Sequence, residues 1–246
     1  GELGWRTVFL WGAGVVALAA SVIVIGGRNA PPGVAWRTGD PSASGFAAIV
    51  RDHRFWRIAF LNLATVGTTF AVQGLWGGPY LTDLYAFGDL QVGNALVGLG
   101  IGVVAGNLAC GWLADRLGRS SVVVVSATVF VATQVLLAMA LPAAPVSAIY
   151  LVFGLSSAYF VVLAAEVRAI FPLNLTGRAL TGINFFGMAG AMVVQWLMGI
   201  MIGAGSGVAG YRVAFTTTAA LAAVALVVYL PGTRLRESKI LAHDEA

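Results

Sequence analysis

Long runs without a charged residue are the feature that most constrains this sequence. The longest covers 46 residues between Arg119 and Glu166, and prolines at 142 and 145 divide it midway. Five other runs are 21 to 33 residues long. A helix needs about 20 apolar residues to cross the hydrocarbon core of a membrane. The longest run therefore predicts two spanning helices around a short turn, and each other run predicts one, which makes seven spans.

The seven predicted spans account for most of the chain. They cover residues 7–25, 58–80, 91–113, 121–141, 148–170, 179–203 and 212–230. Backbone groups in lipid must bond within their own segment, so these stretches predict helices, and a barrel would need short segments of alternating polarity. Apolar residues make up 59% of the chain and charged residues 10%, against about a quarter charged in soluble domains. The predicted fold class is an all-α polytopic membrane protein.

The basic residues gather on one side of this topology. If the loop at 26–57 faces the cytoplasm, 12 of the 14 Lys and Arg lie on that side, and Arg6 and Arg212 lie on the other. This is the positive-inside distribution of a membrane protein. The basic pI of about 9.6 therefore calls for no nucleic-acid partner. We predict an integral protein of a bacterial inner (plasma) membrane, with the lipid bilayer as its partner.

Residues suited to catalysis or metal binding are scarce. The one cysteine, Cys110, allows no internal disulfide, and His53 and His243 lie too far apart in sequence to suggest a metal site. No segment is typical of a phosphate loop or a catalytic triad. We therefore expect no metal, no cofactor and no enzymatic activity.

The first and last predicted spans open on similar sequences. Residues 4–9 read GWRTVF and residues 210–215 read GYRVAF. The two lie six helices apart and run in the same direction, as expected for a parallel repeat of six helices. On this interpretation the seven spans are helices six to twelve of a twelve-helix, two-bundle protein, and a missing N-terminal helical half is expected before Gly1.

Four segments follow from that interpretation. They are the last helix of the N-terminal half at 1–25, a cytoplasmic linker between the halves at 26–57, the C-terminal six-helix half at 58–230 and a cytoplasmic tail at 231–246. Within the linker, Phe46, Ile49 and Val50 recur at helical spacing, and Arg51 and Arg54 lie off that face. This pattern predicts a short amphipathic helix, at about 46–56, on the membrane surface.

The sharpest local motif lies between the third and fourth spans. Residues 111–120 read GWLADRLGRS, which resembles the G-x-x-x-D-R-x-G-R-[K/R] signature of the major facilitator superfamily. In that family the signature follows helix two and, more loosely, helix eight, which agrees with the count from the repeat. Ser120 departs from the basic residue usual at its position. The resemblance implies a major-facilitator-like fold, and a latch formed by Asp115, Arg116 and Arg119 that stabilises one transport conformation.

Two acids bear on this latch. Asp115 is expected at a helix C-terminus, where the helix dipole disfavours an acid, so it needs cationic partners. Glu166 is the one acid within a predicted span, and the run from Glu166 through a Phe-Pro pair to Arg178 resembles the family's pattern after helix ten. We favour a cytoplasmic network of Glu166 with the arginines over a proton carrier, which is expected nearer the midplane. The motif arginines could instead be simple positive-inside anchors.

A stripe of polar residues runs along the second predicted span. Its members advance by three or four residues and so share one helix face: Asn62, Thr65, Thr69, Gln73 and Trp76. Three further cavity candidates are Tyr159 in the fifth span and Asn184 and Gln195 in the sixth. In the family resembled, helices seven and ten contribute to a central cavity. The alternative is hydrogen bonding between helices, which Asn, Gln and Thr commonly supply in membranes.

Glycines recur at every fourth position in two spans. The rows are Gly98, Gly102 and Gly106 in the third span and Gly199, Gly203 and Gly207 at the outer end of the sixth. Small residues at this spacing predict close helix packing and need no ligand.

We therefore predict transmembrane transport of a small solute by alternating access, in which two helical halves rock around a midplane site. The expected partners are a small-molecule substrate, with a proton or counter-substrate as an optional coupled solute, and the N-terminal half. The alternative is a seven-helix membrane receptor or sensor. A retinal pump is disfavoured because the one lysine, Lys239, follows the last span. Members of the family resembled that carry phosphorylated organic anions use a midplane arginine from each half. No arginine lies mid-span here, so the resemblance argues against a phosphate-bearing substrate.

Overall fold

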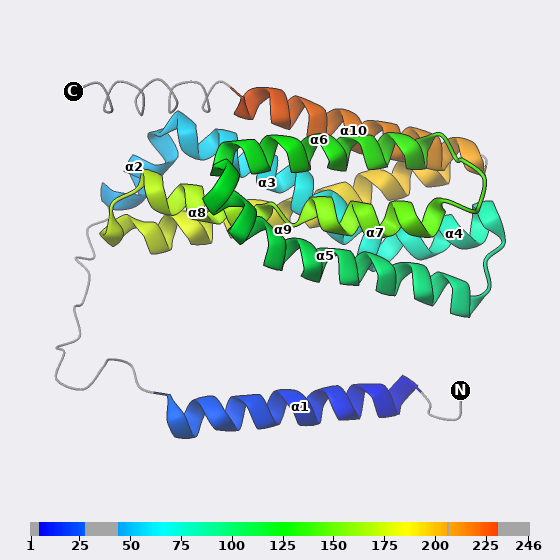
Figure 1. Cartoon of the computed structure of the whole chain (residues 1–246), viewed down its shortest axis with the longest axis horizontal. Coiled ribbons are helices and arrows are strands. Elements are labelled where there is room, and N and C mark those ends of the chain that lie inside the picture. Colours follow the sequence, from blue (N-terminus) through cyan, green and yellow to red (C-terminus); the bar gives the residue numbers. More distant parts are fainter. Residues whose placement is uncertain (1–4, 28–43, 206, 231–246) are drawn as a thin grey trace. The chain divides into compact units, whose positions relative to one another are not determined.

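The computed structural model describes residues 5–27, 44–205 and 207–230, and their regular secondary structure is helical (Figure 1). The chain divides into two units, Gly1–Pro41 and Ser42–Ala246, which are described separately. The predicted tail at 231–246 and residues 28–43 of the predicted linker lie outside the described residues.

The first unit contains one described helix, α1 (Trp5–Gly26). Its stretch Arg6–Gly26 is 21 residues long, which is enough to cross a membrane, and its most apolar 18-residue window has a mean hydropathy of 2.5. This confirms the span predicted at 7–25.

The second unit is a helical bundle. Its described elements, in chain order, are α2 (Ser44–Arg51), α3 (His53–Ala71), the π-helical turn η1 (Val72–Trp76), α4 (Gly77–Tyr85), α5 (Asp89–Leu117), α6 (Arg119–Ala138), α7 (Val146–Ser157), α8 (Phe160–Ile170), α9 (Leu173–Ala204) and α10 (Val208–Tyr229). With α1, the described residues provide seven stretches long and apolar enough to span a membrane. The seven predicted spans are thus confirmed, although two of them are interrupted.

Asp52 divides the predicted surface helix at 46–56 into two parts. α2 ends at Arg51, and the Asp52 side chain accepts the backbone N–H of Arg54 at 2.8 Å, which caps the start of α3. Aspartate suits this position because its carboxylate takes up an otherwise unpaired amide of the first turn. Ile49 of α2 is buried, whereas Phe46 is exposed. The α3 helix therefore begins five residues before the predicted span at 58–80.

The wide turn η1 interrupts the next span. The backbone N–H of Gly77 bonds to the carbonyl of Val72, five residues back, as in a π-helix. Pro79 accounts for this change, because it has no N–H for the carbonyl of Leu75 and its ring would clash with that carbonyl in a regular helix. The extra residue rotates the positions that follow, so the stripe predicted along 62–76 does not lie on one straight face.

A second interruption separates α7 from α8, within the span predicted at 148–170. The hydroxyls of Ser156 and Ser157 donate to backbone carbonyls three residues back, at 3.1 and 2.8 Å. Such bonds compete with the backbone ladder and bend helices. Tyr159, which lies at the break, is fully buried.

Two helix pairs make the most extensive contacts in the bundle, α3 with α9 and α5 with α7. At the second crossing, a methyl group added to Gly154 would overlap the carbonyl of Leu99, and one added to Gly102 or Gly106 would overlap the backbone of α7. Small residues allow helix backbones to approach this closely. The predicted packing row is confirmed at Gly102 and Gly106, whereas Gly98 has nothing within 4 Å of an added methyl group.

Candidate functional site

Three hydrogen bonds join the broken helix α3–η1 to α9. Asn62 Nδ2 donates to the carbonyl of Ile183 at 2.8 Å. Trp76 Nε1 donates to the main-chain carbonyl of Gln195 at 2.9 Å, and Gln195 Nε2 donates to the carbonyl of Phe70 at 3.2 Å. The last bond lies beside η1, where the change to π-type bonding leaves a helix carbonyl short of its usual donor. The two helices are thus held together along their length by side-chain amides and an indole.

Three of the eight predicted cavity residues are buried in contacts between helices. Asn62 is 3% exposed, and Thr65 and Tyr159 are fully buried. The Thr65 hydroxyl bonds to the carbonyl of Leu61 at 2.8 Å and also to the Tyr159 hydroxyl. These contacts match the alternative noted from the sequence, in which Asn and Thr bond helix to helix.

The other five candidates lie nearer the surface of the unit, but they do not share one surface. Thr69 is half-buried and donates to the carbonyl of Thr65 at 2.7 Å. Gln73 is exposed on the side of η1 toward α5, since a methyl group on Gly100 of that helix would lie 3.9 Å from its amide nitrogen. Asn184 is exposed on α9. Trp76 and Gln195 are the pair that the structure brings together.

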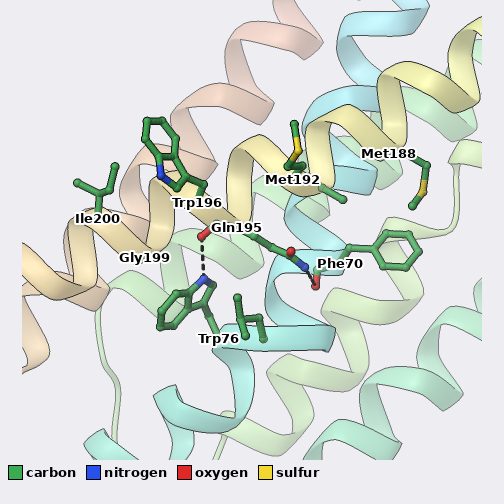
Figure 2. A pocket seen from close by; sticks show the side chains of 10 residues that line it. Phe70, Trp76, Met188, Met192, Gln195, Trp196, Gly199 and Ile200 are labelled. Carbon is green, nitrogen blue, oxygen red and sulfur yellow. Dashed lines mark hydrogen bonds between the residues drawn. The ribbon is translucent and has the colours of Figure 1, made fainter.

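Trp76 and Gln195 line a groove between η1 and α9 (Figure 2) with a volume of about 730 Å³. This volume lies in the range usual for small-molecule sites, which are mostly apolar with a few polar groups. The remaining lining residues carry no ionisable side chain: Phe70, Leu75, Met188, Ala191, Met192, Trp196, Gly199 and Ile200. The lining residues of α9 other than Gln195 could not be singled out from the sequence, because apolar residues at every fourth position of a membrane helix are equally typical of contact with lipid.

The predicted latch residues lie at the turn between α5 and α6. Gly118 adopts a positive φ of 84° there, a backbone conformation that glycine permits and that lets the chain reverse tightly. Asp115 is exposed in the last turn of α5, and the guanidinium of Arg116 lies 4.1 Å from the ring centroid of Trp112. Arg119 is exposed at the start of α6. Within the described residues, the three charged residues of the motif form no ion pair or hydrogen bond with Glu166.

Glu166 is buried in α8. It is 2% exposed, and it accepts a hydrogen bond from the Tyr229 hydroxyl of α10 at 2.9 Å. Arg178, in the first turns of α9, is half-buried. A buried acid in a membrane helix is costly and needs partners, and Tyr229 supplies one.

Tyrosines stabilise the end of the bundle where α4 ends and α10 begins. The Tyr211 hydroxyl of α10 donates to Asp83 of α4 at 2.7 Å. Its ring also packs edge-on against Tyr80 at a centroid distance of 5.4 Å. Tyr211 is the aromatic residue of the repeated GYRVAF segment, and it fixes α4, the segment that follows η1, to α10.

Four buried side-chain polar atoms were not singled out from the sequence. Arg57 Nη1 and Thr68 Oγ1 in α3, Asn107 Oδ1 in α5 and Gln134 Oε1 in α6 have no hydrogen-bond partner in the described part of the chain. Such atoms are uncommon and cost free energy. Their residue types alone gave no signal, since burial depends on the packing of the neighbouring helices. The described residues contain no group of three His, Cys, Asp or Glu that could hold a metal ion.

Comparison with known proteins extends these observations. The profile of the Major Facilitator Superfamily matches residues 77–245. The chain belongs to the major facilitator superfamily. The family resemblance drawn from residues 111–120 is thus confirmed, as is the helical membrane fold class, and the match leaves the receptor alternative without support.

Curated relatives in the superfamily are bacterial. A gentisate transporter of Corynebacterium glutamicum is 31% identical over 98% of this chain and 55% of its own length. A chloramphenicol resistance protein of Streptomyces lividans is 33% identical over 46% of this chain and 29% of its own length. The chain spans about half the length of the gentisate transporter.

A solved structure shows the same superfamily fold. It is the crystal structure of a bacterial homologue of the iron transporter ferroportin in an outward-facing state. The TM-score is 0.64 at 16% sequence identity, and the match covers 88% of this chain and 52% of that chain. At this identity the likeness shows the fold alone.

Proposed function

We propose that this chain is part of a secondary transporter that moves a small organic solute across the membrane by alternating access. The observation that carries the proposal is the superfamily match over α4 to α10, in a chain that spans 55% of a transporter 31% identical to it. Two spans broken by η1 and by the α7–α8 junction support it, since non-regular helix at membrane depth often marks a transport path.

The first cargo to test is gentisate. The C. glutamicum relative is named a gentisate transporter, and the groove lining of the present chain is aromatic and thioether-rich. A proton or a counter-substrate is proposed as the coupling partner. The N-terminal helical half is proposed as the structural partner, and a bacterial inner membrane is the proposed location.

The proposed solute path runs along the exposed side of η1 and α9. Trp76 and Gln195 would contact the solute in the groove, and Thr69, Gln73 and Asn184, which do not line the groove, would contact it at other points of the path. Asn62, Thr65 and Tyr159 would hold the helices beside the path together without contacting the solute, because their polar groups already bond neighbouring helices.

The α5–α6 turn is proposed as a conformational latch. Asp115, Arg116 and Arg119 are exposed at one end of the bundle. They could therefore form ion pairs with other helices when a conformational change brings those helices against this end. Glu166 and Arg178 would stabilise the same cytoplasmic end from within.

Uptake of radiolabelled gentisate tests the proposed function. Cells that express the full-length protein should accumulate the label with saturation, and cells with an empty vector should not. Equal uptake by both, with the protein present in the membrane, would reject gentisate as cargo.

A further inference from the structure

The groove between η1 and α9 has walls that suit a flat ring. Two indoles, Trp76 and Trp196, and the ring of Phe70 line it, together with the thioethers of Met188 and Met192 (Figure 2). Aromatic rings pack on one another in offset or edge-on geometry, and methionine sulfur makes favourable contacts with ring edges. A saturated chain would fill the same space without these contacts, so the lining favours aromatic ligands.

Trp76 is a fixed wall of this groove. Its Nε1 is committed to the carbonyl of Gln195 at 2.9 Å. Its ring lies against the backbone of α9, since a methyl group on Gly199 would come within 2.9 Å of Trp76 Cζ2. The indole therefore offers a ligand its ring surface rather than its N–H, and it needs no rearrangement to do so.

Gln195 supplies a polar contact of defined direction. Its Nε2 donates to the carbonyl of Phe70 at 3.2 Å, which orients the amide. Among the described residues no donor reaches its Oε1, so this oxygen is left to accept a bond from a ligand. An acceptor without a charged neighbour selects a neutral donor, such as a ring hydroxyl.

The lining residues carry no ionisable side chain. A carboxylate on the ligand would therefore find no counter-charge within the groove, and it must be bound by residues outside it. The groove is thus suited to one part of a solute, its ring.

We propose that this groove binds the aromatic ring of the transported solute, with a ring hydroxyl donating to Gln195 Oε1. The proposal rests on the proposed transport function, because it names the part of the cargo that this surface recognises. Its occupant is a planar ring bearing a hydrogen-bond donor.

Binding measurements test whether the aromatic and methionine side chains of the groove contact the ring of the ligand. The full-length protein in lipid nanodiscs is titrated with gentisate, benzoate and cyclohexanecarboxylate. Trp196→Ala should weaken the binding of gentisate and benzoate about tenfold and Met192→Ala about threefold, because ring contacts are lost. Trp196→Phe should stay within about threefold of wild type, since it keeps an aromatic face. Binding of cyclohexanecarboxylate, which should be weak, is expected to change little.

The polar contact is tested by comparing two ligands. Gentisate has ring hydroxyls and benzoate has none, so wild type should bind gentisate about fivefold more tightly, as expected for one net hydrogen bond. Gln195→Leu should remove this preference. A general loss of folding would weaken the binding of both ligands equally. The ratio of the two affinities therefore distinguishes a lost contact with the ring hydroxyl from a misfolded protein.

Leu108→Ala is the matched control, because Leu108 is 77% exposed on α5 and lies outside the groove. It should leave all affinities unchanged. The proposal would be overturned if neither aromatic ligand showed saturable binding. It would also be overturned if the binding did not change in Trp196→Ala, Met192→Ala and Gln195→Leu. Lipid, the N-terminal half or a second copy of the chain would then fill the groove. Ring binding with this variant pattern, but without uptake, would uphold the ring site and contradict the transport function.

Discussion

Asp52 determines where the chain enters the bundle. Its carboxylate caps α3 through the Arg54 backbone N–H and pairs with the Arg54 guanidinium at 2.7 Å. The hydrogen bond from the Arg54 side chain lowers the pKa of Asp52 below its ordinary value of 3.8. Because the folded pKa is the lower one, this contribution to stability is present above about pH 4 and is lost as the pH falls through the folded pKa.

Asp52→Ala should lower the free energy of unfolding by about 1 kcal/mol, the usual cost of a lost N-cap. Asp52→Asn should retain most of that stability, because its side-chain oxygen can still cap and an exposed ion pair adds little. Thermal unfolding of the purified full-length protein at neutral pH measures both. Equal destabilisation by the two variants would show that the charge, rather than the cap, matters.

A Tyr159 variant tests whether the predicted cavity residues line the solute path or bond one helix to another. Its hydroxyl bonds to Thr65 in a fully buried contact, so Tyr159→Phe should lower stability by about 0.6 kcal/mol, a typical value for a hydrogen bond between membrane helices. The KM for transport should not change. A several-fold rise in KM with unchanged unfolding temperature would instead place Tyr159 in the solute path.

The candidate site could be predicted from the sequence where polarity marked it. Trp76 and Gln195 stood out as amphipathic or polar residues in apolar spans, and the structure brings them together. Met188, Met192 and Trp196 could not be found in this way, because lipid and a ligand groove select the same apolar residue types. Only the position of α9 beside η1 distinguishes them.

At the scale of the elements, the spans could be predicted because membrane crossing imposes a length and a polarity. The interruptions within two of these spans could not be predicted from the sequence. The proline at position 79 lies near the end of its predicted span, and whether it kinks, widens or ends a helix depends on how the freed carbonyls are bonded. Gln195, more than 100 residues further along the chain, donates to one carbonyl beside that turn.

The α5–α7 crossing gives a matched pair of glycine variants. Gly154→Ala should destabilise the bundle by about 1–3 kcal/mol, because the new methyl group overlaps the backbone of α5. Gly98→Ala should be neutral or stabilising by up to about 1 kcal/mol, since it meets nothing within 4 Å and alanine favours a helix. Unfolding temperatures of the two variants check this. Equal effects would contradict the close crossing.

At the scale of the whole molecule, the helix ends of the second unit alternate between its two sides. The ends near α2, the α5–α6 turn and the α8–α9 turn lie together in Figure 1, opposite the α4–α5 and α6–α7 connections. The basic residues gather on the first side, and we propose that this side faces the cytoplasm.

Single cysteines test this orientation in cells that express the full-length protein. Leu173→Cys, at a position 93% exposed beside the α8–α9 turn, should resist an impermeant thiol reagent in intact cells and react after permeabilisation. Ala86→Cys, in the α4–α5 connection, should react in intact cells. The reverse pattern would invert the topology.

Exchange across proteoliposomes tests the central claim, transport by alternating access, most directly. The full-length protein is reconstituted, and influx of labelled gentisate is measured with and without unlabelled gentisate inside. We expect saturable influx that becomes faster when unlabelled gentisate is inside. The conformational change that returns the empty carrier limits the rate, and a carrier loaded with internal solute makes that change faster. Asp115→Asn should slow the exchange and leave the affinity unchanged, as expected for a latch distant from the groove. Influx that is unsaturable, or indifferent to internal solute and equal to that of protein-free vesicles, would contradict the account.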